Sequence, residues 1–294
     1  MNLNRIRAGL LLAALPLILL FLSGCSMNRL AVIGAEPILV GGQSAMYRET
    51  DLKLARDAMP AQLMLIQGLL QEDPHNPRLL LYAARGFYGY TFGFVEDHDR
   101  RRASKLYERC FHYGLAALRE EGLDLDPQHA QQQQVQAAVA RLGRSAVPGL
   151  FWTASCWAKW IDMNRDDPAR VAELGRAAVL MRRVLKLDEG YFHGGADLFF
   201  GVYYGGRPPM LGGDYRKARR YFERAERISG GKLFLVDVLY AEYLARQTQN
   251  RALFEKKLRS VLSRPADEVP DLALFNRIAQ AKARRLLAHE KDYF

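Results

Sequence analysis

Apolar side chains recur every three or four positions along this chain from residue 52 to residue 288, and no convincing run of alternating apolar and polar residues is present. That spacing places the apolar side chains on one face of an α-helix. Capping and turn residues divide the pattern, with Thr50 or Asp51, Asp99 and Asp214 as helix caps. The pattern therefore predicts an all-α fold of antiparallel helix pairs, with helices over 52–70, 78–94, 100–121, 130–142, 149–163, 168–187, 196–204, 215–229, 232–247, 250–262 and 272–288.

A block of sequence occurs twice, 115 positions apart. Residues 99–110 and 214–225 both read Asp-x3-Ala-x3-aromatic-Glu-Arg-small, and Gly86 aligns with Gly201 at the same offset. That offset is too long for one helical-repeat unit, so it indicates a duplicated block of several helices, at about 65–110 and 180–225. Stacked helix pairs form concave binding surfaces more often than catalytic sites.

Each copy carries the residue pattern of a tetratricopeptide-like helix pair. The shared small, aromatic and small positions are Ala103, Tyr107 and Cys110, and Ala218, Phe222 and Ala225. Small residues allow helices to approach closely, and the aromatic ring fills the adjacent groove. We therefore predict tetratricopeptide-like helical hairpins, with an extra loop inside each pair, that form a compact, internally duplicated domain over residues 50–290.

The N-terminus has the three parts of a lipoprotein signal. Arg5 and Arg7 form a basic start, residues 8–21 are an apolar run, and Leu22-Ser23-Gly24 precedes Cys25. This order predicts a signal peptide over residues 1–24 and a lipid on Cys25. The alternative is an ordinary thiol that follows a plain secretory signal.

A lipid on Cys25 would anchor the protein to a membrane in the periplasm. Ser26 follows it where Asp would resemble an inner-membrane retention signal, so the sequence favours the outer membrane over the inner. Residues 25–49 are expected to be a linker, because Gly41-Gly42 interrupts the apolar stretch before it reaches the domain.

The composition of the chain excludes few classes of function. The formal net charge is +10, and removal of Arg5 and Arg7 leaves +8. The basic residues are interleaved with Asp and Glu along amphipathic helices, which favours a solvated surface over a nucleic-acid site. An apolar content of 49% is enough for a full core.

The sequence contains no catalytic or metal-binding motif that we recognise. The histidines form no His-Glu-x-x-His and no Cys/His cluster, and no Gly-x-Ser-x-Gly or Walker loop is present. We therefore predict no enzyme activity, metal or cofactor. Glu96, Asp97 and Asp99 are assigned to the cap and dipole of the helix that follows them.

Two cysteines remain after Cys25. Cys110 and Cys156 both lie in apolar helical surroundings, where buried free thiols are common. A disulfide between them is the alternative in an oxidising compartment, and their spacing does not decide the question.

Aromatic residues supply the candidate ligand site. One run follows Gly86, its counterpart lies in the second copy, and a tryptophan cluster lies between them. A stripe of this kind is most often core, but glycines leave space beside the rings, and a buried tyrosine hydroxyl needs a partner. The candidate ligand-binding residues are Tyr88, Tyr90, Phe92, Trp152, Phe200, Tyr203 and Tyr204. If Tyr88 and Tyr203 point into one shared cavity, they would orient the head group of a ligand while the Phe rings bury its apolar part.

A stiff loop lies between residues 205 and 213. Its Arg207-Pro208-Pro209 segment is a candidate contact for a protein partner, since proline restricts the unfolded chain and helps to present an exposed loop. The alternative is a connection that only sets the angle between two helices.

Several stretches together resemble the TRAP transporter T-component family of lipoproteins, and the resemblance covers nearly all of residues 50–290. They are Thr50-Asp51 through Pro60, Gly68 to Pro74, Gly86 to Asp97, Gly206 to Asp214, Leu274-Phe-Asn276 and Leu286-Leu287. The resemblance implies an all-helical lipoprotein with cryptic tetratricopeptide repeats. It also implies oligomers, association with a periplasmic substrate-binding protein (the P-component), and an apolar cavity or pore for a hydrophobic ligand.

These observations favour a lipid-anchored periplasmic binding protein that serves TRAP-type transport. It would dock the substrate-binding protein and hold a hydrophobic ligand. The alternative is an envelope scaffold that assembles proteins without a small molecule. A continuous apolar cavity between the helices distinguishes the two.

Overall fold

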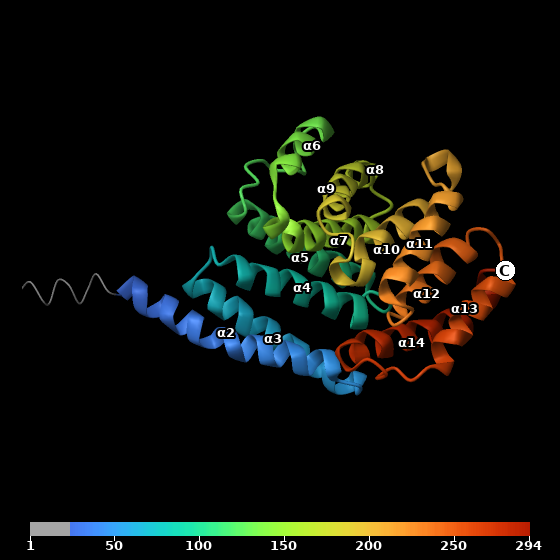
Figure 1. Ribbon diagram of the computed structural model, residues 1–294, viewed down its shortest axis with the longest axis horizontal. Helices are drawn as coiled ribbons and strands as arrows, with labels where there is room; N and C mark the ends of the chain where they lie inside the picture. The colour runs from blue at the N-terminus through green and yellow to red at the C-terminus, as the bar shows by residue number, and fades with distance from the viewer. Residues whose placement is uncertain (1–23) are drawn as a thin grey trace, which may run out of the picture.

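The computed structural model describes residues 24–294, with side chains from residue 32 onward, and every regular element in that range is helical (Figure 1). The all-α prediction is confirmed. The signal-peptide residues 1–23 lie outside the described part. The helices are α2 (Gly24–Arg48), α3 (Leu52–Glu72), α4 (Pro77–Phe94), α5 (Arg100–Glu120), α6 (Gln132–Arg141), α7 (Val147–Met163), α8 (Pro168–Ala172), α9 (Leu174–Leu187), α10 (Tyr191–Gly205), α11 (Tyr215–Ser229), α12 (Leu235–Tyr240), α13 (Arg251–Ser263) and α14 (Ala273–Ala288). A π-helical turn, Ala241–Ala245, continues α12, and 3₁₀ turns lie at Arg144–Ala146, Pro209–Leu211, Pro270–Leu272 and Glu290–Asp292.

Three predicted caps begin their helices as expected. The carboxylates of Asp51, Asp99 and Asp214 each accept hydrogen bonds from backbone N–H groups two or three residues further on. These N–H groups have no partner inside the helix, so a carboxylate at the cap both satisfies them and favours the helix dipole.

The duplicated segments form two helix pairs, α4 with α5 and α10 with α11. The shared small, aromatic and small positions of α5 and α11 are all fully buried. At Gly201 an added Cβ would lie 2.8 Å from the ring of Phe222, so glycine is needed for this close approach. The tetratricopeptide-like geometry of the pairs stays a prediction.

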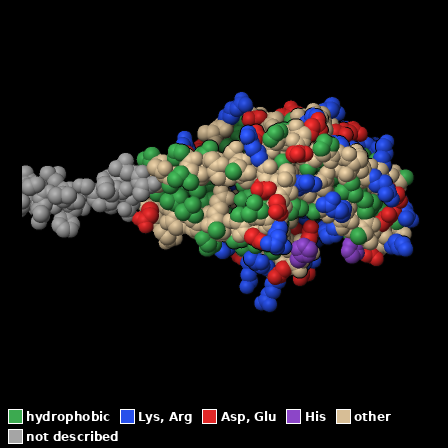
Figure 2. All heavy atoms as spheres, turned by 90° about the horizontal axis from the view of Figure 1, so that it is seen from below, with side chains coloured by type: hydrophobic (Ala, Val, Ile, Leu, Met, Phe, Trp, Pro, Cys, Tyr) green, Lys and Arg blue, Asp and Glu red, His purple; other side chains and the backbone are tan. Residues whose placement is uncertain are grey.

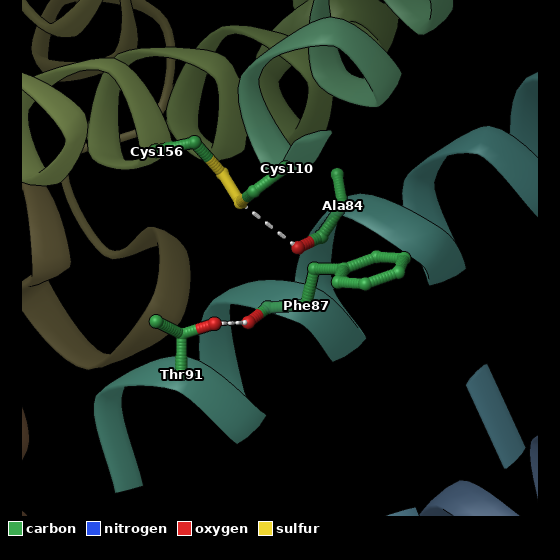
Figure 3. Close-up of a disulfide and its surroundings, with 5 residues drawn as sticks. All are labelled: Ala84, Phe87, Thr91, Cys110 and Cys156. Atoms are coloured by element: carbon green, nitrogen blue, oxygen red, sulfur yellow. Dashed lines mark hydrogen bonds between the residues drawn. A yellow bond between two sulfur atoms is a disulfide. The ribbon is translucent and has the colours of Figure 1, made fainter. Parts of the chain in front are cut away.

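A disulfide joins Cys110 of α5 to Cys156 of α7, with 5.6 Å between the Cα atoms (Figure 3). The sulfur of Cys110 also lies 3.2 Å from the carbonyl oxygen of Ala84 in α4. The bond therefore ties two neighbouring core helices at the point where a third packs on them.

The segment expected to be a linker is the helix α2, and Gly41-Gly42 does not break it. Helix α2 packs on α3, on the 3₁₀ turn before α14 and on α14 itself, and it buries Leu39. This packing outweighs the poor helix propensity of the two glycines. The first described helix and the last α-helix are thus neighbours (Figure 1).

One other predicted helix is divided, and the start of another is kinked. The helix expected over 168–187 is divided into α8 and α9 at Glu173, whose carboxylate accepts a hydrogen bond of 2.7 Å from the indole of Trp157. Helix α10 has a kink near its start, because Phe192, His193 and Gly194 have left-handed backbone angles. The regular part of the helix therefore starts close to the predicted Ala196. Phe192 near its start has a φ of 48°, and its ring packs against the rings of α7, 5.0 Å from that of Trp152.

Candidate functional site

A mainly apolar cavity of about 100 Å³ lies between helices that are far apart in the sequence. Helices α2, α3, α4, α7, α10, α12 and α14 contribute to its walls. The lining residues are Leu39, Gln43, Met46, Tyr47, Met59, Gln62, Leu63, Ile66, Tyr82, Arg85, Gly86, Tyr88, Gly89, Phe92, Trp152, Phe192, Leu235, Leu274, Phe275 and Ile278. Such a chamber, apolar with a few polar groups, is typical of small-molecule sites.

Three of the candidate ligand residues lie on the wall of this cavity. Tyr88 and Phe92, one turn apart on α4, stack with 5.9 Å between ring centroids, and Trp152 meets Tyr88 edge-on at 5.5 Å. Burial raises the pKa of Tyr88 to about 12, so its hydroxyl stays protonated at neutral pH. These three residues give the wall aromatic faces and a neutral hydroxyl.

The other candidate aromatic residues do not line the cavity; they are Tyr90, Phe200, Tyr203 and Tyr204. The hydroxyl of Tyr90 accepts a hydrogen bond of 3.3 Å from α5. The ring of Tyr204 stacks on that of Tyr221 in α11, 5.8 Å away. Tyr88 and Tyr203 therefore do not share this cavity, because the second aromatic run packs against α11.

Arg85 was not among the residues predicted from the sequence, although it is the one charged residue that the described part of the chain places on the cavity wall. Its guanidinium lies over the ring of Tyr47, 4.6 Å from the centroid, and its Nη1 donates to Gln43 at 3.3 Å. A signal was present, since Arg85 is the only charged residue between Arg78 and Glu96. The partners from α2 gave no comparable signal, because α2 was read as a linker.

A cluster of buried charged side chains lies next to the ring of Phe92. Glu96, whose side chain is only 7% exposed, accepts from Lys159 at 2.7 Å, from Lys282 at 2.8 Å and from the hydroxyl of Tyr107 at 2.6 Å. Burial alone would raise the pKa of Glu96, but the two ammonium groups outweigh it and lower the pKa to about 2. The ammonium of Lys282 also lies 4.2 Å from the centroid of the Phe92 ring.

The assignment of Glu96 and Asp97 to the cap of α5 is wrong, since only Asp99 caps that helix. The carboxylate of Asp97 pairs instead with Lys282 at 3.0 Å and with Arg285 at 2.7 Å. These ion pairs join the end of α4 to α14. The cluster therefore holds together two walls of the cavity.

The candidate partner loop is more closely packed than expected. The guanidinium of Arg207 lies 4.0 Å from the centroid of Tyr203 and donates to the carbonyl oxygen of that residue at 3.0 Å. Pro208 is partly buried and Pro209 exposed. The large apolar side chains that this loop exposes to solvent are Met210, 88% exposed, and Leu211, 65% exposed. Both follow the predicted segment.

The model of the TRAP transporter T-component family matches residues 48–294. This chain belongs to that family. The resemblance to this family that the sequence indicated is therefore confirmed. It is a family of transport-associated components and not an enzyme family. Within residues 24–294, no helix is long and apolar enough to cross a membrane, and no cluster of His, Cys, Asp or Glu forms a metal site.

A relative of this T-component is an uncharacterized protein of Treponema pallidum (strain Nichols). It is 25% identical over 305 aligned residues, which cover 94% of each chain. The family match begins at Arg48, the last residue of α2. The cavity wall that α2 supplies therefore lies ahead of the matched region.

Proposed function

We propose that this T-component holds a small apolar molecule in its cavity while it works beside a periplasmic substrate-binding protein of a TRAP-type transporter. The cavity carries the proposal, because its walls offer aromatic and aliphatic side chains with few polar atoms. Burial of apolar ligand surface would supply most of the binding free energy. Membership of the family supports the association with a transport system.

The proposed location is the periplasm, with a lipid on Cys25 and the outer membrane as the anchored surface. The exposed apolar side chains of α2 and α3 support a position close to a membrane; they include Ile33, Ile38, Met64 and Leu65. Figure 2 shows hydrophobic side chains gathered on this face beside the start of α2. Short apolar surfaces of this kind strengthen attachment when a lipid anchor is already present.

The proposed contact for the substrate-binding protein is the tip of the 205–213 loop, and it centres on Met210 and Leu211. Two adjacent exposed apolar side chains on a loop held by Arg207 form a small preorganised patch. Met210→Asp should weaken binding of a purified TRAP-type substrate-binding protein from the same organism by more than about tenfold. Ile38→Asp, at an exposed position on α2, is the control.

The ligand proposal can be tested by native mass spectrometry of residues 26–294 purified gently from the envelope of the host. We expect a reproducible extra mass that is lost on denaturation. Gly89→Leu should abolish it, since Gly89 lines the cavity and an added Cβ meets only Met59, at 3.5 Å. Gly68→Leu is the matched control, because that helical glycine faces open space.

An extra mass that persists in Gly89→Leu would contradict the cavity as its site. Wild-type protein that carries no small molecule, but co-purifies with a substrate-binding protein, would favour the scaffold alternative. The same spectra count the chains in each assembly and so test the expected homo-oligomer.

A further inference from the structure

One part of the cavity wall differs chemically from the rest. Among the described residues that line the cavity, Arg85 is the only charged one, and none of these side chains is a carboxylate. Its buried Nε has no hydrogen-bond partner within residues 24–294, and neither does the buried hydroxyl of Tyr47. Burial raises the pKa of Tyr47 to about 12, although Arg85 has the opposite effect. The hydroxyl therefore keeps its proton at neutral pH and can donate a hydrogen bond.

These two groups therefore present unpaired donors and a fixed positive charge. Buried donors almost always have an acceptor, and an unpaired one is costly. A guanidinium matches the geometry of a carboxylate, which can accept from two of its N–H groups at once. The ring of Tyr47 under the guanidinium, with Trp152 and Phe192 at 5.8 Å, holds this planar group in place.

We infer that the cavity binds a monocarboxylate with an apolar body, and that Arg85 and Tyr47 hold its carboxylate. This inference rests on the proposed function and adds to it the chemical class of the ligand. The Nε–H of Arg85 and the O–H of Tyr47 donate to the two carboxylate oxygens. The apolar body lies along Tyr88, Phe92 and Trp152.

The cavity volume of about 100 Å³ sets the size of that body. An engineered cavity of about 150 Å³ in another protein admits a benzene ring. The body is therefore comparable to one aromatic ring or a short alkyl chain. A long-chain fatty acid would fit only if part of the cavity wall were displaced. Helix α2 forms part of that wall.

Three ligands of equal, short chain length test the inference with residues 26–294: pentanoate, 1-pentanol and pentylammonium. Isothermal titration calorimetry at pH 7.5 should show pentanoate at least ten times tighter than 1-pentanol, and pentylammonium weakest. Arg85→Gln should remove the advantage of pentanoate and leave the affinity for 1-pentanol within about twofold. Arg85→Lys keeps the charge without the planar fork, so it should recover only part of the advantage.

The outcomes separate the two proposals. If none of the three ligands binds, a small apolar ligand in this cavity is refuted, and the inference falls with it. If 1-pentanol binds as tightly as pentanoate to the wild-type protein, the cavity still takes apolar ligands but the carboxylate inference is wrong. This comparison needs no variant, so it stands even if Arg85→Gln fails to fold.

Discussion

Replacement of Glu96 by Gln is the strongest test of how the cavity walls are held together. The variant keeps the shape of the side chain but removes the negative charge that Lys159 and Lys282 share. In the folded protein the pKa of Glu96 falls from 4.5 to about 2. Each pKa unit corresponds to about 1.4 kcal/mol, so the charged form contributes about 3 kcal/mol to stability at neutral pH.

The loss of one partner from a buried ion pair gives a similar magnitude, about 3–5 kcal/mol, because the remaining charges stay buried. For a chain of this size, a change of about 3 kcal/mol corresponds to a melting temperature lower by about 6–12 °C. Circular dichroism at 222 nm on residues 26–294 measures this shift. Glu268→Gln is the matched control, since Glu268 pairs with Lys232 at the surface, with 45% of its side chain exposed, and should change stability by less than about 1 kcal/mol.

The pH dependence adds a second readout. Because the folded-state pKa of Glu96 lies below its unfolded value, the folded protein binds this proton more weakly than the unfolded chain does. The stabilisation is therefore complete above pH 4.5 and is lost as the pH falls toward about 2. The gap between wild type and Glu96→Gln should shrink over that range; equal stabilities at pH 7, or a gap that does not change with pH, would refute the reasoning.

Three further predictions follow from other parts of the structure. Replacement of both Cys110 and Cys156 by Ala should lower the free energy of unfolding by about 4 kcal/mol in the chain-entropy treatment of a loop of 46 residues, measured by urea denaturation; a loss below about 1 kcal/mol would contradict it. Trp152→Phe should abolish the change in tryptophan fluorescence on addition of pentanoate, because the other two tryptophans do not line the cavity; a change that persists would place the ligand elsewhere. Asp197→Asn should raise stability at pH 7 by about 1–3 kcal/mol, since burial raises the pKa of Asp197 from 3.8 to about 6 and its charged form is therefore unfavourable. That gain should disappear as the pH falls from about 6 to 3.8, and a gain that is constant with pH would point to another cause.

The sequence predicted well what depends on local pattern. Carboxylates such as Asp51 and Asp214 act on backbone groups two or three residues away, so their role as caps can be read from the chain. The spacing of the small and aromatic residues in α5 and α11 likewise identified positions that are buried.

The candidate site was harder to predict because tertiary packing forms it. Tyr88 and Tyr203 occupy equivalent places in the duplicated pattern, but only the first has an empty neighbouring space, since Tyr221 of α11 occupies the region beside the second aromatic run. Glu96 looked like a cap residue because its partners, Lys159 and Lys282, lie 63 and 186 residues away. No local pattern reports such distant pairs.

The contact between α2 and α14 has a consequence for how the protein is made. Tyr47 packs on Phe275 with 4.9 Å between ring centroids, and Arg48 pairs with Asp271 at 2.7 Å. The N-terminus of a chain is synthesised first, so α2 is available for folding long before α14 exists. To bring these ends together closes a loop of more than two hundred residues, which is entropically costly until the helices between them are in place. The pocket is thus among the last features to form during biogenesis, and a chain shortened at either end lacks one of its walls.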